Sequence, residues 1–217
     1  MKTIDPIICI SGTDGTGKST LVAALARALP GSRPVSIWDM MAEPKIRGAF
    51  GSKAGLNAVL ATLGPDARSL FCATALKEAL ERSGRGVRIV DSHWYKFMAT
   101  ELALGADPAL AGTMARLFPR PALTLQLALN PRIAAERKQG QYTAYECGLT
   151  APTFESFVKF QSRTVELVRQ LTKEDGHRVV TLDATLPAEV LLRQAREAVR
   201  VALPEAMAAE ADGAALQ

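Results

Sequence analysis

Short apolar runs alternate along the chain with longer segments in which apolar positions recur at helical spacing. The runs contain few polar residues, which is typical of strands that are buried on both faces of a sheet. We predict five such strands, at residues 7–10, 35–38, 86–91, 123–129 and 179–183. Between them, we predict helices at residues 20–29, 56–62, 66–83, 109–117, 132–138, 154–172 and 187–203, and one more that ends near residue 104.

This alternation of strand and helix predicts a parallel sheet covered by helices on both faces. The fold class is therefore α/β, a three-layer α/β/α sandwich that binds ligands at the carboxyl ends of its strands. Segment 40–55 contains three glycines and is predicted to be rich in loops. No linker or internal repeat divides the chain, so we expect one domain over residues 1–204. The tail at 205–217 is rich in alanine and glutamate, and we expect it to be flexible.

The amino-acid composition is ordinary and is compatible with this fold class. Of the 217 residues 48% are hydrophobic and 22% charged, which is ordinary for a soluble protein, and the net charge is +4. No concentrated basic face is evident, so we expect no nucleic-acid partner. Cys9, Cys72 and Cys147 lie far apart and predict reduced thiols. There is no signal-peptide pattern and no run of about 18 apolar residues, so we expect a cytoplasmic protein without a membrane partner.

One motif predicts a nucleotide site. The turn after the first strand reads Gly12-Thr13-Asp14-Gly15-Thr16-Gly17-Lys18-Ser19 and leads through Thr20 into a helix. It matches the pattern G-x-x-x-x-G-K-[ST], whose backbone N–H groups surround phosphate oxygens at a helix N-terminus. Lys18 can reach the β- and γ-phosphates, and the Ser19 hydroxyl can ligate Mg²⁺. Residues 12–19, called the phosphate loop below, thus predict binding of a nucleoside triphosphate such as ATP in a P-loop NTPase fold.

A carboxylate follows another buried strand. Asp91 ends the run at 86–91, where a carboxylate can hold Mg²⁺ opposite the hydroxyl of Ser19. The other interpretation is that Asp91 caps the helix that follows, since aspartate is a preferred N-cap. We favour the metal role because the phosphate loop creates a need for such a carboxylate.

Positive charge gathers after the fourth strand, at Arg132, Arg137 and Lys138. Such residues usually form a solvated helix face. Phosphoryl transfer, however, needs positive charge over the migrating group, and the variable positions of the phosphate loop contain no arginine. We therefore expect residues 132–152 to form a lid that closes over the site, with Arg137 as the first candidate for neutralising the transferred group.

The absence of two motifs narrows the class of protein. The chain contains neither the N-K-x-D signature of GTPases nor the L-S-G-G-Q signature of transporter ATPases. A small single domain with a phosphate loop and a basic lid suits a kinase that acts on a small acceptor.

Over residues 5–200 the sequence resembles the thymidylate kinase family of nucleoside monophosphate kinases. The phosphate loop, including Asp14, is similar to that family's G-x-D-G-x-G-K-[ST]-T. Weaker similarities are Glu43-Pro44 to the end of R-E-P, 70–73 to L-L-F-A-A, 90–91 to the strand ending in D-R-[YF], 131–138 to P-E-x-A-x-x-R-[RK], and 182–185 to I-D-A-S. The resemblance implies that Asp14 lies near the sugar and phosphate of the acceptor and that Asp183 and Ala184 lie on the adenine side. It also suggests a homodimer.

The departures from the family pattern fall on the acceptor side. Ser92 stands where the family has the arginine of D-R, and Thr74-Ala75 stands where the acceptor helix has D-R. Charge-assisted arginine contacts to phosphate are among the stronger polar contacts, so these losses weaken acceptor binding unless another cation replaces them. His93, Lys77 and Lys96 are the candidates.

The sequence therefore predicts an ATP-dependent phosphotransferase acting on a nucleoside monophosphate, of the thymidylate type (dTMP + ATP to dTDP + ADP). Lys18, Arg137, Asp14 and Asp91 are its expected catalytic residues. Two alternatives stay open. One is a kinase for a nucleoside or another small metabolite, and the other is an ATP-binding regulatory protein with little transfer activity. The identity of the acceptor is not determined by these motifs.

Overall fold

The computed structural model describes residues 5–205, and strand and helix alternate along this range. The strands are β1 (Ile7–Ser11), β2 (Arg33–Val35), β3 (Arg88–Asp91), β4 (Leu123–Ala128) and β5 (Val179–Asp183). The α-helices are α1 (Lys18–Ala28), α2 (Pro44–Phe50), α3 (Lys53–Thr62), α4 (Pro65–Arg82), α5 (Trp94–Ala103), α6 (Ala109–Leu117), α7 (Pro131–Lys138), α8 (Phe154–Asp175) and α9 (Ala188–Ala202). Two short 3₁₀ helices, η1 (Ile37–Ala42) and η2 (Tyr145–Cys147), complete the described elements.

The strands form one parallel sheet in the order β2-β3-β1-β4-β5. Because all strands run the same way, their carboxyl ends share one edge. The central strand β1 pairs with β3 on one side and β4 on the other, and Ile10 is in register with Asp91. The phosphate loop and Asp91 therefore emerge side by side.

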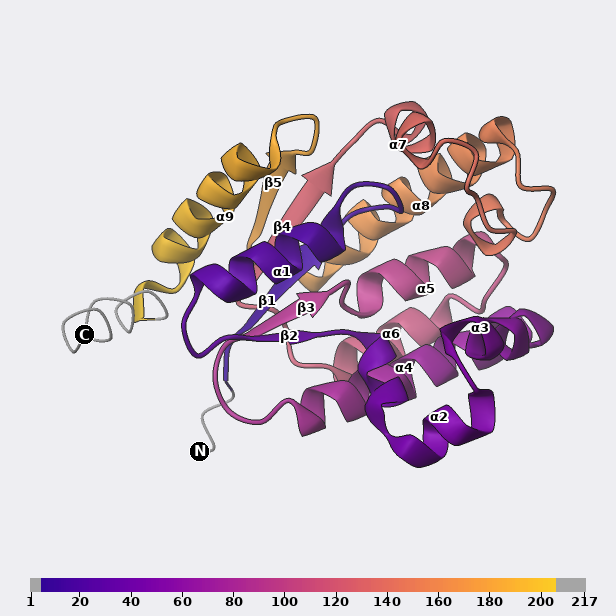
Figure 1. The fold of residues 1–217 in the computed structure, drawn as a ribbon, viewed down its shortest axis with the longest axis horizontal. Coiled ribbons are helices and arrows are strands. Elements are labelled where there is room, and N and C mark those ends of the chain that lie inside the picture. The colour runs from indigo at the N-terminus through magenta and orange to yellow at the C-terminus, as the bar shows by residue number, and fades with distance from the viewer. Residues whose placement is uncertain (1–4, 206–217) are drawn as a thin grey trace.

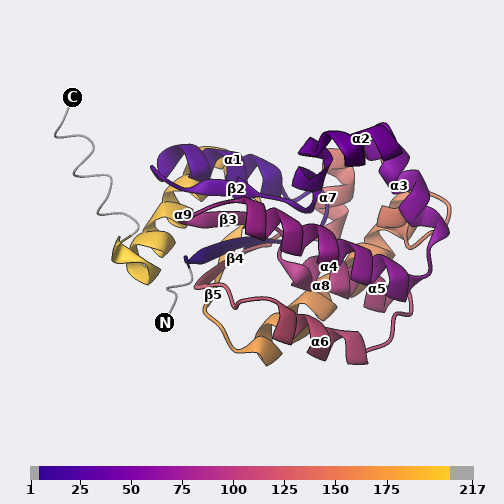
Figure 2. The same cartoon turned by 90° about the horizontal axis from the view of Figure 1, so that it is seen from below.

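Helices cover both faces of this sheet, as Figures 1 and 2 show. Helices α1 and α9 lie on one face, and α4, α5 and α8 lie on the other. Alternate residues of β1 enter the two cores, because successive side chains of a strand point to opposite faces. Ile8 and Ile10 pack with α1 and α9, whereas Ile7 packs with α4, α5 and α8. The predicted fold class, a three-layer α/β/α sandwich with five parallel strands, is confirmed.

Two local predictions were wrong. The second strand comprises Arg33–Val35 and not residues 35–38, because a capping box ends it. Ser36 accepts a hydrogen bond from the backbone of Trp38, and Asp39 accepts one from Ser36, so this segment turns into η1.

Segment 40–55, expected to be rich in loops, contains α2 and the start of α3. Glu43 caps α2 and Pro44 occupies its first turn, while the Ser52 hydroxyl caps α3. Proline at a first helical turn and serine at an N-cap both favour helix formation, and here they outweigh the glycines.

The three cysteines are free, as predicted, and all three are buried. No helix within residues 5–205 has the length and apolar character needed to cross a bilayer. Most of the tail expected at 205–217 lies outside the described residues.

Candidate active site

The phosphate loop joins β1 to α1, and the backbone conformation favours glycine at positions that include Gly15 and Gly17. Gly17 caps α1 with a φ of +89°, and a Cβ there would point into open space, so the loop presents its backbone outward. Gly15 has a φ of +82°, and a Cβ there would meet the Ala134 carbonyl oxygen of α7 at 3.0 Å. The loop is thus a backbone-lined concavity at the N-terminus of a helix, which favours anions.

The two threonines of the loop serve its internal structure. The Thr16 hydroxyl donates to the Thr13 carbonyl oxygen at 2.8 Å, and both side chains are buried. Among the remaining residues predicted to contact the nucleotide, Gly12 lies buried at the end of β1, and Thr20 is exposed in the first turn of α1. Backbone groups of the loop therefore remain its principal means of binding phosphate.

Lys18 lies along the inside of the loop. Its Nζ donates to the Thr13 carbonyl oxygen at 2.7 Å and lies 3.9 Å from Asp14 Oδ1. Burial lowers the pKa of Lys18 to about 8, although Asp14 acts in the opposite direction. A bound polyanion would favour the charged form of this lysine, so its environment suits a residue that binds phosphate.

Ser19 and Asp91 form the predicted metal pair. The Ser19 hydroxyl donates a 2.6 Å hydrogen bond to Asp91 Oδ2. Within residues 5–205 there is no group of three or more histidine, cysteine, aspartate or glutamate side chains arranged to hold a metal. Mg²⁺ does not need one, because it is usually held by one or two carboxylates together with substrate phosphates and water. The pair therefore fits Mg²⁺, which it would hold beside the phosphates of a bound nucleotide.

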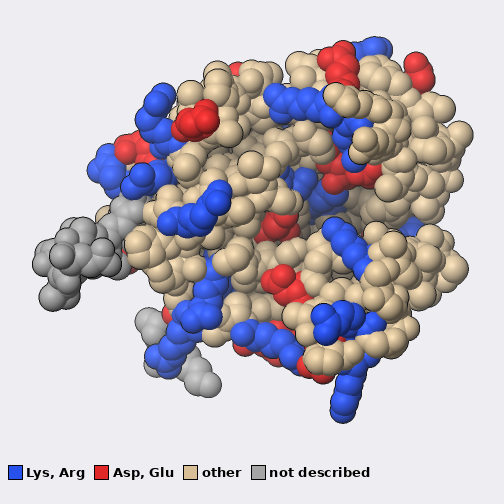
Figure 3. Space-filling view, in the orientation of Figure 1, with Lys and Arg blue, Asp and Glu red and all other residues tan. Residues whose placement is uncertain are grey.

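Asp14 is bound by a second lysine. Lys96, in the first turn of α5, donates to both Asp14 carboxylate oxygens, at 2.8 and 2.9 Å. Burial opposes charge on both groups, yet Asp14 raises the pKa of Lys96, and Lys96 together with Lys18 lowers the pKa of Asp14 well below its ordinary range. Both groups are therefore charged at neutral pH. Figure 3 shows acidic and basic side chains side by side in a hollow at the carboxyl end of the sheet.

Helix α7 and the segment after it lie against the phosphate loop. Arg137 Nη2 donates to the Ala184 carbonyl oxygen at 2.9 Å, in the turn after β5. Lys138 forms an ion pair with Glu146 at 2.8 Å. The lid movement of residues 132–152 and the charge-neutralising role of Arg137 stay predictions.

Gln161 links this segment to the phosphate loop, and the sequence analysis missed it. Its Oε1 accepts from the backbone N–H of Asp14 at 3.3 Å, and its Nε2 donates to the Glu146 carbonyl oxygen at 2.9 Å. The side chain is 1% exposed. The sequence pattern could have indicated that Gln161 is buried, because it follows Phe157 by four residues on the apolar face of α8. A buried amide needs hydrogen-bond partners, so a structural role would have followed.

Comparisons with known proteins identify chains that are similar to this one. No family model matches the chain. A protein from Methanospirillum hungatei named "Probable thymidylate kinase" is 29% identical over 92% of this chain and 96% of its own length. A "Probable thymidylate kinase 2" from Saccharolobus solfataricus is 25% identical over 83% of this chain and 89% of its own.

The chain is thus similar to two probable thymidylate kinases over most of its length. Two solved structures share its fold. Deoxyadenosine kinase from M. mycoides with bound dATP has a TM-score of 0.58 and 16% identity, and covers 88% of this chain and 97% of its own. Thymidylate kinase from Candida albicans has a TM-score of 0.61 and 18% identity, and covers 91% and 92%. The protein is thus an enzyme, a kinase of nucleosides or nucleotides.

On the acceptor side of this kinase, the structure separates the three candidates for the missing arginines. Lys77 is exposed on α4 and lies 3.6 Å from Glu81. His93 is buried, and neither of its ring nitrogens has a hydrogen-bond partner. Burial lowers the pKa of His93 to about 3, so it carries no positive charge at neutral pH. Lys96 is the candidate that contacts the phosphate loop.

A buried ion pair, also missed from sequence, connects α4 and α5 to η2. Arg68 of α4 donates from Nε to both carboxylate oxygens of Glu101 of α5 at 3.0 Å, and its Nη2 lies 2.9 Å from Oε2. The Tyr145 hydroxyl of η2 donates to the same carboxylate. Since both charged side chains are almost fully buried, this cluster fixes α4, α5 and η2 relative to one another.

The adenine side predicted from the family resemblance lies in the turn after β5. The Asp183 carboxylate accepts from the backbone and the hydroxyl of Thr185, and these hydrogen bonds lower the pKa of Asp183. The Ala184 backbone N–H donates to the Ala128 carbonyl oxygen at 2.9 Å, which joins the turn to β4. Their contact with adenine stays a prediction.

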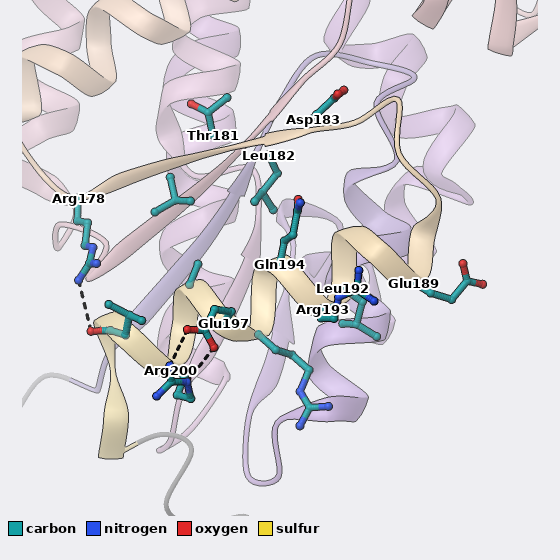
Figure 4. Close-up of a pocket in the computed structure, with 14 residues that line it drawn as sticks. Arg178, Thr181, Leu182, Asp183, Glu189, Leu192, Arg193, Gln194, Glu197 and Arg200 are labelled. Atoms are coloured by element: carbon teal, nitrogen blue, oxygen red, sulfur yellow. Dashed lines mark hydrogen bonds and ion pairs between the residues drawn. The ribbon is translucent and has the colours of Figure 1, made fainter.

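A groove between β5 and α9, shown in Figure 4, contains no residue of the phosphate loop. Asp183 lies at its end. The Arg200 guanidinium is paired with Glu197, at 2.6 and 2.8 Å, and Arg178 Nη1 donates to the Val201 carbonyl oxygen at 3.5 Å. The candidate active site is therefore the hollow at the phosphate loop and not this groove.

Proposed function

We propose that this kinase transfers the γ-phosphoryl group of ATP to a nucleoside monophosphate, with thymidine monophosphate as the first candidate acceptor. The names of its sequence relatives support this acceptor. The chemical observation that carries the proposal is that each carboxylate described at the site is already engaged by a cation or a hydrogen-bond donor.

The donor half of the site consists of the phosphate loop, Lys18, Ser19 and Asp91. Loop N–H groups and Lys18 hold the triphosphate, and Ser19 and Asp91 hold Mg²⁺. The metal supplies charge neutralisation on the phosphate oxygens. Catalysis then depends mainly on positioning and electrostatics, because the chain has little covalent chemistry to perform.

The partners of these carboxylates bear on whether the acceptor is a nucleoside or a nucleoside monophosphate. Asp14 is held by Lys96 and Lys18, Asp91 accepts from Ser19, and Glu146 is paired with Lys138. Lys96 and Lys18 lower the pKa of Asp14, so this carboxylate is a weak base. A nucleoside hydroxyl must lose a proton when it attacks, and it therefore needs a general base.

A monophosphate makes no such demand. Its second pKa is about 6, so it is mostly a dianion at neutral pH and offers an oxygen that is ready to attack. That oxygen attacks the γ-phosphorus in line, and the bond from the γ-phosphorus to the bridging oxygen breaks. ADP leaves with the bonding electron pair, and the acceptor becomes a diphosphate. Arg137, on the lid, adds positive charge over the migrating group.

A nucleoside acceptor is the second candidate. Two observations favour it: the fold resembles that of a deoxyadenosine kinase, and the two arginines of the family's acceptor side are absent at Ser92 and Ala75. Both acceptors require the same donor site, so the choice between them depends on direct comparison.

The deciding experiment is an acceptor screen with ATP and Mg²⁺, in which each nucleoside is assayed beside its 5′-monophosphate and the products are identified by mass spectrometry. We expect turnover with thymidine monophosphate and little with thymidine. Turnover confined to nucleosides would replace the proposal by the second candidate. Release of ADP without any phosphorylated acceptor would remove both. Lys18→Ala is the control for contaminating kinases, and we expect it to lower the rate by at least about 100-fold.

A further inference from the structure

We propose that Lys96 is the residue that binds the phosphate of the acceptor, in place of the arginines that the family pattern has at positions 92 and 75. This inference rests on the proposed function, because it assumes that the acceptor carries a phosphate. Three lines of argument lead to it: the position of Lys96 beside the donor site, the conformation of Ser92, and the engagement of the neighbouring cations.

The first argument is the position of its ammonium group. Lys96 Nζ lies 2.8 Å from Asp14 Oδ1, and Lys18 Nζ lies 3.9 Å from the same oxygen. The two ammonium groups therefore lie on one carboxylate oxygen, within a few ångströms of each other. Lys18 belongs to α1 and serves the donor phosphates, whereas Lys96 reaches the carboxylate from α5. Lys96 therefore brings a positive charge from α5 to the edge of the phosphate loop.

The electrostatic requirement at this point is large. Two phosphates, each with a charge near −2, must come within bonding distance, and their repulsion has to be offset by fixed positive charge. Lys96 stays protonated, since Asp14 raises its pKa even though the site is buried. Its side chain is 17% exposed, so the ammonium group is largely desolvated but accessible to a ligand. A charge in such surroundings interacts more strongly than one on the open surface.

The second argument is the conformation at position 92. Ser92 has a φ of +61°, and its backbone N–H donates to the Ile10 carbonyl oxygen at 3.0 Å. Its short side chain contacts the carboxylate of Asp91, at 3.4 Å. Ser92, which follows β3, thus contacts the proposed metal ligand Asp91 and carries no positive charge. The first cation of α5 is Lys96, one helical turn further along the chain.

The third argument is that the neighbouring cations are engaged elsewhere. Arg68 is neutralised by Glu101 and Lys138 is paired with Glu146, while Arg137 donates to the Ala184 carbonyl oxygen and is assigned above to the transferred group. Lys96 is held by Asp14, which is itself shared with Lys18. Asp14 is the carboxylate that contacts Lys96 directly, whereas Asp91 and Glu146 act on it at longer range, and an incoming phosphate can share Lys96 with Asp14.

This assignment has a consequence for selectivity. An arginine binds a phosphate through two parallel N–H···O hydrogen bonds, whereas a lysine presents a single charge at the end of a flexible side chain. The acceptor phosphate is thus recognised by its charge more than by its orientation. We expect Lys96→Arg to retain binding, because the charge is conserved.

The test is direct binding, measured by calorimetry on the full chain. Thymidine monophosphate, thymidine and a non-hydrolysable ATP analogue with Mg²⁺ serve as probes for Lys96→Met, Lys96→Arg and the matched control Lys77→Met. We expect Lys96→Met to raise the Kd for the monophosphate by at least about tenfold, the loss of one charge-assisted contact. The Kd values for thymidine and the ATP analogue should change less than about twofold. Lys96→Arg should restore most of the affinity, and Lys77→Met should behave as the unmodified protein.

A purely structural role for Lys96 would weaken all three probes together, and that result overturns the inference. An unchanged Kd for the monophosphate in Lys96→Met overturns it as well. Retained binding of the ATP analogue and an unchanged melting temperature show that the variant is folded. The two proposals fail differently. Turnover of the monophosphate that is insensitive to Lys96→Met removes only the inference, whereas absence of monophosphate binding and turnover in the unmodified protein removes both.

Discussion

Ser19 Oγ lies 2.6 Å from Asp91 Oδ2, although 72 residues of sequence separate them. The pairing of β1 with β3 brings the two together, because parallel neighbours end at the same edge of the sheet. The contact joins Ser19, the last residue of the phosphate loop, to the carboxylate at the end of the neighbouring strand β3. The predicted metal ligands and the phosphate loop are thereby connected to the central sheet at one point.

If Asp91 holds Mg²⁺, Asp91→Asn should raise the Mg²⁺ concentration needed for binding of a non-hydrolysable ATP analogue by at least about tenfold. The amide retains the shape of the side chain but loses the charge. A Mg²⁺ titration at fixed analogue concentration measures the effect. Glu174→Gln, at the exposed end of α8, is the charge-matched control. An unchanged Mg²⁺ dependence would assign Asp91 to a structural role at the start of α5.

Arg137→Ala separates two roles of one arginine. If the guanidinium neutralises the transferred group, kcat should fall by about 10² while the KM for ATP changes little, because the contact is made in the transition state. If Arg137 serves only to hold Ala184, the KM for ATP should rise at constant kcat. Arg132→Ala, on the same helix, is the control. Its guanidinium lies 5.8 Å from the Phe154 ring, and we expect little change in either constant.

Gln161→Leu should lower the free energy of unfolding by about 1–3 kcal/mol, the cost of leaving buried polar groups without partners. The substitution removes the acceptor for the Asp14 N–H and the donor to the Glu146 carbonyl oxygen. Denaturant unfolding measures it, with Gln170→Leu on the exposed face of α8 for comparison. Equal effects of the two substitutions would show that the amide of Gln161 does not matter to the phosphate loop.

The buried pair of Arg68 and Glu101 offers a test by double substitution. Arg68→Met alone should cost about 3–5 kcal/mol of stability, because it leaves a buried carboxylate without its cation. Arg68→Met combined with Glu101→Leu should recover most of that loss, since no unpaired charge remains. Chemical denaturation of the two single variants and the double variant gives the coupling energy. Additive losses would contradict a direct interaction.

Acid should destabilise the protein through His177. This ring lies between Asp175, at 3.2 Å, and the Thr124 hydroxyl, at 2.7 Å. Burial lowers the pKa of His177 below 6.5, although Asp175 acts in the opposite direction. The folded state thus holds the neutral ring, and the unfolded chain binds a proton first as the pH falls. The stability that His177 contributes is present above pH 6.5 and declines below it, by at most about 1.4 kcal/mol per pH unit.

The matched variant is His177→Gln. The difference in unfolding free energy between the unmodified protein and this variant should be largest near pH 8 and should shrink as the pH falls from 6.5 to 5. Denaturant unfolding at several pH values measures it. A difference that stays constant over this range would show that the ring does not titrate on unfolding.

The amino-acid sequence by itself determined the layered fold and the donor half of the site. Strands buried on both faces leave continuous apolar runs, and a phosphate loop is contiguous in sequence, so local pattern is sufficient to predict both. Residue pairs such as Ser19 and Asp91 could be expected because the ends of parallel strands converge. The helices in segment 40–55 were missed because caps at Glu43 and Ser52 outweighed the glycines.

Only the tertiary structure decided which of the three candidate cations contacts the phosphate loop. Sequence left His93, Lys77 and Lys96 as equal candidates, because nothing local shows which side chain reaches Asp14. Packing of α5 against the core buries His93 and directs Lys96 to the phosphate loop. Gln161 and the pair of Arg68 and Glu101 were likewise invisible as partners, since their contacts join helices far apart in the chain. Contacts of this kind depend on how helices pack, and that packing is a property of the folded whole.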